Sequence, residues 1–217
     1  MNMSKPVQTI AIDGTAASGK GTLAKALATH LGFDYLDTGK LYRAVGLAAL
    51  EAGLMLEASE EAEIAALARA LELPVQDNKA LHEEQTAHAA SVVAAMAEVR
   101  TALLARQRDF AANPPGGKGA VLDGRDIGTV ILPDADIKFY VDARAKVRAE
   151  RRFMELSGRG EVITREQVLA DIQSRDARDK NRPVAPLKPA ENAILVDSSD
   201  KNAQTVLSEV LSKLQDR

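Results

Sequence analysis

Short apolar runs and longer amphipathic stretches alternate along the first part of the chain. Residues 7–12 are apolar and β-branched, bounded by a proline and a glycine turn, which predicts a strand buried on both faces. Leucines then recur at helical spacing through residues 23–31, and Gly32 is placed to end that helix. Residues 33–36 predict a second short strand, followed by an apolar helix that stops at Gly53. This strand–helix–strand order favours a parallel sheet.

The rest of the pattern divides into a helical region and a second series of strands and helices. Residues 60–112 are alanine-rich and helix-forming, with Pro74 and its polar neighbours as the clear break, which predicts a helical insertion. The sheet resumes after a Pro- and Gly-rich turn at residues 113–117. We predict these later elements: strands at residues 120–122, 137–141 and 193–196, a charged helix at 144–156, a mobile turn at 157–160, a helix opened by a capping box at 164–167, and a closing helix with its apolar face at 206–214.

Glycines, a lysine and a threonine follow the first predicted strand. Gly14, Gly19 and Lys20 have the spacing of a Walker A phosphate loop, with the strand before and the helix after that this motif requires. Backbone N–H groups and the positive end of a helix dipole suit a polyphosphate, and an ordinary glycine-rich turn is the alternative. The expected ATP-binding residues are Gly14, Thr15, Ala16, Ala17, Ser18, Gly19, Lys20, Gly21 and Thr22.

The hydroxyl that usually binds magnesium in this motif is displaced. Gly21 stands directly after Lys20, where Ser or Thr is usual, and Thr22 comes one residue later. We therefore expect Mg²⁺ to be held mainly by phosphates and water, with Thr22 or Asp123 as possible protein ligands. No other metal site is expected, because the chain has no Cys and its 3 His show no metal-ligand spacing.

Composition and charge narrow the function classes. With 217 residues, 46% of them hydrophobic, the chain can fill the core of one good-sized domain. A net charge of −3 and a pI near 5.7 argue against binding a nucleic-acid backbone. The lack of Cys agrees with a reducing compartment, and no apolar run reaches ~18 residues. We expect a cytoplasmic monomer that acts on small molecules, with neither nucleic acid nor membrane as partner.

Four further stretches resemble a known family. They are Asp37-Thr38-Gly39-x-x-Tyr42-Arg43, Ala89-Ala90-Ser91 with Val99-Arg100 downstream, Asp123-Gly124-Arg125-Asp126-Ile127-Gly128-Thr129, and Arg175-Asp176-x-Arg178-Asp179-x-Asn181-Arg182. With the Gly-Lys-Gly-Thr form of the phosphate loop, they resemble the bacterial cytidylate kinase family of nucleoside monophosphate kinases. The resemblance implies an α/β P-loop kinase, with a central parallel sheet flanked by helices, that transfers the γ-phosphoryl group of ATP to CMP or dCMP and yields CDP or dCDP and ADP.

The resemblance also implies three parts. Residues 1–36 and 113–217 would form the P-loop core, residues 37–112 a helical acceptor-binding insertion, and residues from about 150 to 165 a short lid. A basic cluster begins the lid, so Arg148 and Arg152 are expected to close on the phosphates, and a solvated helix face is the alternative.

An acceptor monophosphate beside a triphosphate needs several cations, and arginine can bind two of its oxygens at once. Together with the resemblance, this gives the expected catalytic residues Lys20, Arg125, Arg152 and Arg175. The expected CMP-binding residues are Thr38, Tyr42, Arg43, Ser91, Arg100, Arg125, Asp126, Arg175, Asp179 and Arg182. Arg175, Asp179 and Arg182 recur at helical spacing, for which a salt-bridged solvent face is the alternative.

Cytosine differs from uracil in its amino donor and its ring-nitrogen acceptor, so a site for it needs a carboxylate and a cation or hydroxyl. The resemblance assigns these roles to Asp126, Arg100 and Ser91, with Arg182 assisting. Ser91 and Arg100 are nine residues apart, on opposite sides of any straight helix. Either the helix breaks between them or the assignment is partly wrong. The rival functions are a kinase for UMP, AMP or shikimate, a GTP-dependent switch, and a non-catalytic nucleotide-binding module.

Overall fold

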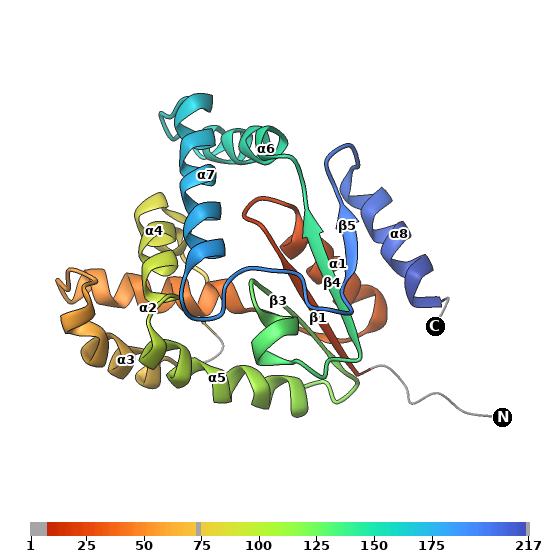
Figure 1. Ribbon diagram of the computed structural model, residues 1–217, viewed down its shortest axis with the longest axis horizontal. Helices are drawn as coiled ribbons and strands as arrows, with labels where there is room; N and C mark the ends of the chain where they lie inside the picture. The colour runs from red at the N-terminus through yellow and green to blue at the C-terminus, as the bar shows by residue number, and fades with distance from the viewer. Residues whose placement is uncertain (1–7, 73–74, 216–217) are drawn as a thin grey trace.

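The computed structural model describes residues 8–72 and 75–215 of the chain. Its centre is a five-stranded sheet in the order β2-β3-β1-β4-β5, and each neighbouring pair is parallel (Figure 1). The strands are β1 (Thr9–Gly14), β2 (Asp34–Asp37), β3 (Ala120–Gly124), β4 (Ile137–Asp142) and β5 (Ile194–Asp197). The expected parallel sheet is confirmed, with β1 in its middle; Val7, where that strand was expected to begin, lies outside the described residues.

Helices cover both faces of this sheet. They are α1 (Lys20–Leu31), α2 (Thr38–Glu51), α3 (Glu61–Ala70), α4 (Glu84–Val93), α5 (Ala97–Ala112), α6 (Ala145–Gly158), α7 (Arg165–Asn181) and α8 (Ala203–Gln215), with 3₁₀ turns at Ala58–Glu60 and Lys79–His82 and a π-helical turn at Ile127–Ile131. On one face Ile12 packs with Leu27 of α1 and Val210 of α8. On the other face Leu122 packs with Ala111 of α5. The sheet is therefore buried on both sides, as its apolar strands require.

Helices α2 to α5 form a helical unit with a hydrophobic cluster of its own; in Figure 1 α2, α3 and α4 lie to the left of the sheet and α5 runs below it. Val45, Ile64 and Leu103 are fully or almost fully buried in it. The helices expected within residues 60–112 are present as α3, α4 and α5, and the break expected at Pro74 lies outside the described residues. A further break separates α4 from α5, whose axes differ by 95°. No single helix in the described ranges is long and apolar enough to span a membrane; α4 and α5 pass that test only as a bent pair.

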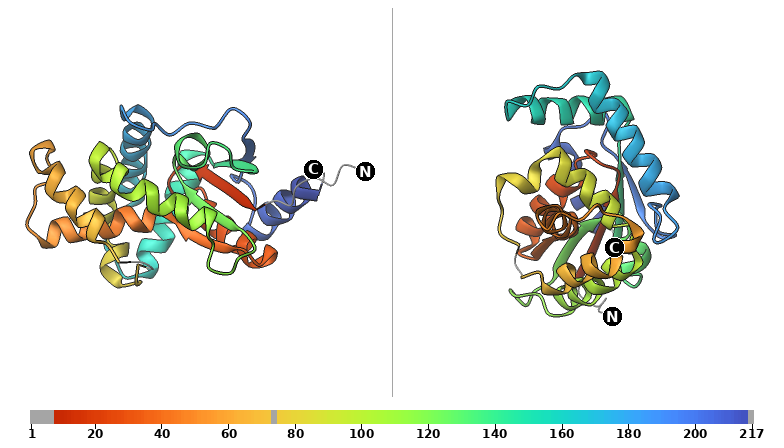
Figure 2. Two further views of the ribbon diagram at one scale, coloured as in Figure 1. Left: turned by 90° about the horizontal axis from the view of Figure 1, so that it is seen from below. Right: turned by 90° about the vertical axis from the view of Figure 1, so that its left-hand side faces the viewer.

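Helices α6 and α7 form a hairpin near the carboxyl ends of the strands, and it arches over the rest of the molecule in the right-hand view of Figure 2. Thr164 Oγ1 accepts the Gln167 N–H at 3.2 Å, and Gln167 Oε1 accepts the Thr164 N–H at 2.8 Å, so the capping box is confirmed. Helix α6 continues past its expected end at Leu156 to Gly158. Leu156 and Val168 are buried between the two helices.

Candidate active site

The loop between β1 and α1 is a tight turn that depends on glycine. A Cβ on Gly14 would lie 2.0 Å from the Val141 carbonyl oxygen, so no larger residue fits beside β4. Gly19 precedes α1 with φ +86°, and Ala17 adopts φ +56°, which non-glycine residues rarely hold. The loop thus wraps around the N-terminus of α1, whose unpaired N–H groups form an anion site.

A cavity of about 250 Å³ opens at this loop, between the sheet, the insertion and the α6–α7 hairpin. Its basic lining residues are Lys20, Arg43, Arg125, Arg152 and Arg175, and its acidic ones are Asp37, Glu84, Asp123, Glu155 and Asp171. The structure therefore places every expected catalytic side chain in the wall of one cavity. Of the expected ATP-binding residues, Ala16, Ala17 and Gly21 also line it.

Three of the five cations of this cavity have lowered pKa values, whereas Arg125 and Arg152 are paired with carboxylates. Burial, and next the positive charge of Arg125, lowers the pKa of Lys20 to about 7. The same causes lower the pKa of Arg175 to about 10, and its buried Nε has no hydrogen-bond partner. Burial, followed by the charge of Arg152, lowers the pKa of Arg43. A polyanion would offset all of these costs, so the residues present fit phosphate groups.

Two aspartates stand in this cavity at the paired ends of β2 and β3. Asp37 and Asp123 are partners in the strand register, and Asp123 Oδ1 accepts from the Tyr35 hydroxyl at 2.9 Å. Burial, followed by the charge of Asp37, raises the pKa of Asp123 to about 6. Proteins usually hold Mg²⁺ with one or two carboxylates together with phosphates and water, and this pair fits that pattern. In the described ranges no three or more His, Cys, Asp or Glu gather as a metal site.

A buried cluster of ion pairs lies next to the cavity and joins the end of β3 to α5 and α7. Asp126 binds Arg100 through Oδ2 and Arg182 through Oδ1, the latter at 3.2 Å. The Tyr42 hydroxyl accepts from Arg100 at 3.4 Å. All three members of the ion-pair cluster are at most 7% exposed. The structure thus brings three of the expected base-binding residues into ion-pair contact. Arg182, expected on the same helix face as Arg175 and Asp179, lies directly after the end of α7.

The break between α4 and α5 removes the difficulty with Ser91 and Arg100, because the two residues belong to different helices. Ser91 Oγ donates to Asp179 Oδ1 at 3.5 Å, and Asp179 Oδ2 accepts from Arg125 Nε at 2.9 Å. Arg100 meanwhile reaches Asp126. The helix does break between the two residues, so their separation in sequence no longer conflicts with a shared site.

Helix α2 carries the other expected acceptor-site residues. Thr38 is its first residue, and the hydroxyl donates to the Asp123 carbonyl at 2.8 Å. Arg43 lines the cavity while its Nη1 donates to the Leu81 carbonyl at 2.8 Å. With Tyr42 beside Arg100, this helix spans the distance from the cavity to the ion-pair cluster.

The sequence does not predict the role of Asp13, the residue directly before Gly14. Its carboxylate accepts the N–H groups of Ile127 and Gly128 at 2.7 and 2.8 Å, and so fixes the turn that directly follows Asp126. Burial raises the pKa of Asp13 to about 7, against the effect of those two hydrogen bonds. The only sequence signal is an acidic residue at the end of a buried strand.

A second cavity, of about 220 Å³, borders the phosphate loop at Ser18 and Gly19 and also escapes the sequence analysis. Arg151 of α6 lines it and donates through Nη2 to the Ser198 carbonyl at 2.6 Å. Thr22, expected near magnesium, lines this cavity and not the first. In the sequence, the polar turn after the last predicted strand could have located this cavity, because that strand ends at the same edge of the sheet as the phosphate loop.

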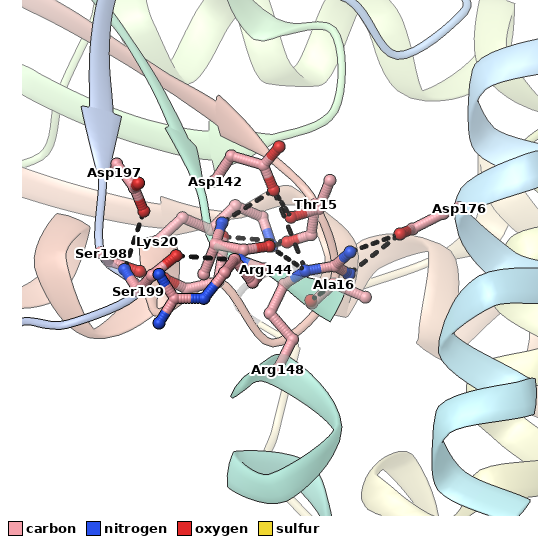
Figure 3. Close-up of polar contacts among 12 residues, drawn as sticks. Thr15, Ala16, Lys20, Asp142, Arg144, Arg148, Asp176, Asp197, Ser198 and Ser199 are labelled. Carbon is pink, nitrogen blue, oxygen red and sulfur yellow. Dashed lines mark hydrogen bonds and ion pairs between the residues drawn. The ribbon is translucent and has the colours of Figure 1, made fainter. Parts of the chain in front are cut away.

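Arg148 and Arg152 have different surroundings, although both lie on α6. Arg152 lines the main cavity and pairs with Glu84 of the insertion at 2.7 Å. The guanidinium of Arg148 binds Asp176 at 2.6 Å and is 4% exposed, outside the residues that line that cavity (Figure 3). Arg148 thus contacts the phosphate loop only from behind, through the Ala16 carbonyl at 3.2 Å.

The parallel sheet, the Walker A loop and the cavity beside it that is lined by Lys20 and four arginines define a P-loop kinase. A gluconokinase from Sinorhizobium meliloti 1021 shares the fold, with a TM-score of 0.51 and 15% identity over 96% of this chain and 91% of its own. The family model for cytidylate kinase matches residues 10–216. The chain belongs to the cytidylate kinase family, as its motifs predicted.

Relatives named cytidylate kinase cover nearly the whole chain. That of Bradyrhizobium sp. (strain ORS 278) is 56% identical over 190 residues, which are 88% of this chain and 87% of its own. That of Paramagnetospirillum magneticum (strain ATCC 700264 / AMB-1) is 52% identical over 205 residues, which are 93% and 95%.

Proposed function

We propose that this protein transfers the γ-phosphoryl group of ATP to CMP or dCMP and releases ADP with CDP or dCDP. One observation carries the proposal: the cavity at the phosphate loop, which is lined by Lys20 and four arginines, adjoins the buried Asp126 cluster. Arg125 lines the cavity, and its neighbour in sequence, Asp126, is held by Arg100 and Arg182. A nucleotide whose phosphate meets Arg125 would therefore direct its base toward Asp126.

The donor triphosphate would lie along the phosphate loop, residues 14–22. Its β and γ oxygens would meet Lys20 and the N–H groups at the start of α1. Its base would enter the second cavity, beside Arg151. Magnesium, which neutralises the phosphates when bound, would be held mainly by those phosphates and water, with Asp123 and Asp37 as the nearest carboxylates.

The acceptor would lie between α2, α7 and the Asp126 cluster. Arg43, Arg125 and Arg175 would bind its phosphate, since all three line the cavity and Arg175 has an unpaired Nε. Asp179 and Ser91 would accept and donate hydrogen bonds at the ribose. The cytosine amino group would donate to Asp126. In this arrangement Arg100, Arg182, Tyr42 and Thr38 complete the acceptor site.

The chemistry then needs no general base, because the attacking oxygen already belongs to an anionic phosphate. Lys20, Arg125, Arg152 and Arg175 would align the two phosphates and offset the charge that spreads over the transferring group. Arg152 sits on α6 and Glu84 on the insertion, so their contact joins the two parts that must approach each other to exclude water. We propose residues 37–112 as the acceptor-binding insertion and residues from about 150 to 165 as the lid of a cytoplasmic monomer.

The test of the reaction is a comparison of acceptors. The purified protein is mixed with Mg·ATP and each common nucleoside monophosphate in turn, and ADP formation is followed. We expect CMP and dCMP to support turnover far better than UMP, AMP or GMP. Equal turnover with UMP and CMP, or none with either, would contradict the proposal.

Asp126→Asn tests the role of the base-binding cluster. An amide keeps the shape but removes the anionic acceptor, which costs on the order of 1.5–3 kcal/mol, or roughly ten- to a hundredfold in kcat/KM for CMP. UMP should lose less, because its C4 carbonyl is repelled by a carboxylate and can accept from an amide. The readout is the ratio of kcat/KM for CMP and UMP. If both values fall together and the ratio is unchanged, Asp126 does not read the base.

A further inference from the structure

Arg148 is a buried arginine whose guanidinium binds groups from three parts of the fold. Its Nε donates to the Ala143 carbonyl at 2.8 Å, and its Nη1 donates to the Ala16 carbonyl at 3.2 Å. Nη1 and Nη2 also bind the two oxygens of Asp176 at 3.1 and 2.6 Å. Figure 3 shows this guanidinium between the phosphate loop and Asp176 of α7. The N–H groups of this one guanidinium thus donate to the chain at the end of β4, to the phosphate loop and to α7.

The bond to the Ala16 carbonyl fixes the direction of the next N–H group. A trans peptide is planar, and its C=O and N–H point to opposite sides of the chain. With the Ala16 oxygen held by Arg148, the Ala17 N–H points the other way. Ala16 and Ala17 both line the main cavity and Arg148 does not, so an N–H that points away from Arg148 is placed to face the cavity.

The same part of the loop is both strained and anchored. Ala17 has φ +56°, which is unfavourable for a residue with a Cβ and persists only where neighbours hold it. On the other side, the Thr15 hydroxyl donates to Asp142 Oδ1 at 2.6 Å. Asp142 lies at the end of β4, 3.9 Å from Arg148 Nε. Two consecutive loop residues are therefore attached to one polar cluster.

We propose that Arg148, oriented by Asp176, is a positioning residue for phosphoryl transfer: it holds the Ala16 carbonyl so that the Ala17 N–H is aimed at the donor phosphates. Arg148 itself touches no substrate. Asp176 directly follows Arg175 in α7, so one ion pair also fixes the phosphate loop relative to the helix that carries a phosphate-binding arginine. A merely structural ion pair between α6 and α7 would hold the two helices together without affecting nucleotide affinity.

Arg148→Lys separates these two roles. A lysine keeps the charge, but its compact ammonium cannot bind the Ala16 oxygen and both Asp176 oxygens in the fork geometry of a guanidinium. We expect the Kd for Mg·ATP, measured by calorimetry without acceptor, to rise about ten- to a hundredfold, as for a lost charged hydrogen bond. The Kd for CMP should stay near the wild-type value. An unchanged Kd for Mg·ATP, or an equal loss for both nucleotides, would overturn the proposal.

Arg165→Lys is the matched control. Arg165 of α7 pairs with Glu150 of α6 at 2.7 Å, so it joins the same two helices through the same kind of bidentate contact. Its side chain is 57% exposed, and its guanidinium lies over the ring of Phe153 of α6, 4.0 Å from the ring centroid. This variant should bind Mg·ATP as the wild type does. A weakening equal to that of Arg148→Lys would assign the effect to helix pairing and overturn the proposal.

The double variant Arg148→Met with Asp176→Leu separates an effect on nucleotide affinity from an effect on folding stability. Replacing both members of a buried ion pair by apolar residues is often neutral or stabilising, so its Tm should return toward the wild-type value. Its affinity for Mg·ATP should remain weakened, because nothing holds the Ala16 carbonyl. If the double variant regains both stability and wild-type affinity, the ion pair is structural and the proposal is wrong.

Discussion

Binding of ATP should be accompanied by uptake of a proton at Lys20. Burial and the charge of Arg125 lower the pKa of this lysine to about 7, so at pH 8 only about one-tenth of the molecules carry the charge. Phosphate oxygens beside the ammonium favour its charged form and return the pKa toward its ordinary value near 10.5. Formation of the complex at pH 8 should then take up about 0.9 proton at this site, and at pH 6 only about 0.1.

The choice of pH 8 separates Lys20 from the carboxyls nearby. Burial raises the pKa of Asp123 only to about 6 and that of Asp13 to about 7, so both are mostly ionised at pH 8. Proton release from either carboxyl on binding would count against the uptake at Lys20. It would occur mainly at lower pH, where these carboxyls are still partly protonated. Lys20→Arg is the control, because a guanidinium stays charged throughout this range and takes up nothing.

The assay is calorimetric titration with Mg·ATP in buffers of different ionisation enthalpy. The slope of the observed enthalpy against the buffer enthalpy gives the number of protons taken up. We expect a slope near one for the wild type at pH 8, a much smaller one at pH 6, and none for Lys20→Arg at pH 8. A slope near zero for the wild type at pH 8, or the same slope in Lys20→Arg, would refute the reasoning.

Two further predictions concern Arg152 and Asp13. Arg152→Ala should lower kcat at least about tenfold while changing the Tm little, because its partner Glu84 is half-exposed and such pairs contribute only about 0–1 kcal/mol; a large fall in Tm with normal kcat would make Arg152 structural. The raised pKa of Asp13 favours the folded state while the group is protonated, and this contribution is lost as the pH rises through about 7. Relative to Asp13→Asn, the wild type should lose about 2–3 kcal/mol of stability between pH 5 and pH 8, and parallel profiles in thermal unfolding would contradict this.

The elements that the sequence predicted best are those with a local physical cause. Apolar β-branched runs gave the strands, and Thr164 with Gln167 gave the start of α7. Gly14 and Lys20 located the phosphate loop because only glycine fits the turn there. Asp126, Arg100 and Arg182 were found through the resemblance to a family, since the sequence spacing alone does not show that they are in contact.

What the sequence missed depends on contacts between distant residues. The bend after Val93, which the sequence left as one of two alternatives, runs through Ala94, Ala95 and Met96, residues that carry no helix-breaking signal. Arg148 and Arg152 are the same residue type one turn apart, and only the positions of Asp176 and the cavity distinguish their surroundings. From the sequence, Asp13 is indistinguishable from an ordinary turn-forming Asp at the end of a strand. Its role becomes visible only through its hydrogen bonds with the N–H groups of Ile127 and Gly128.

The bend between α4 and α5 ties base preference to the folding of the insertion. Arg100 donates through Nη1 to the Ala94 carbonyl at 3.3 Å, so the side chain proposed to read cytosine also caps the end of α4. A substitution there disturbs a helix terminus and a nucleotide contact together. A substitution of Arg100 that changes the preferred base would therefore require a second substitution that restores the bend. Changes of base specificity through a single substitution should be rare along this lineage.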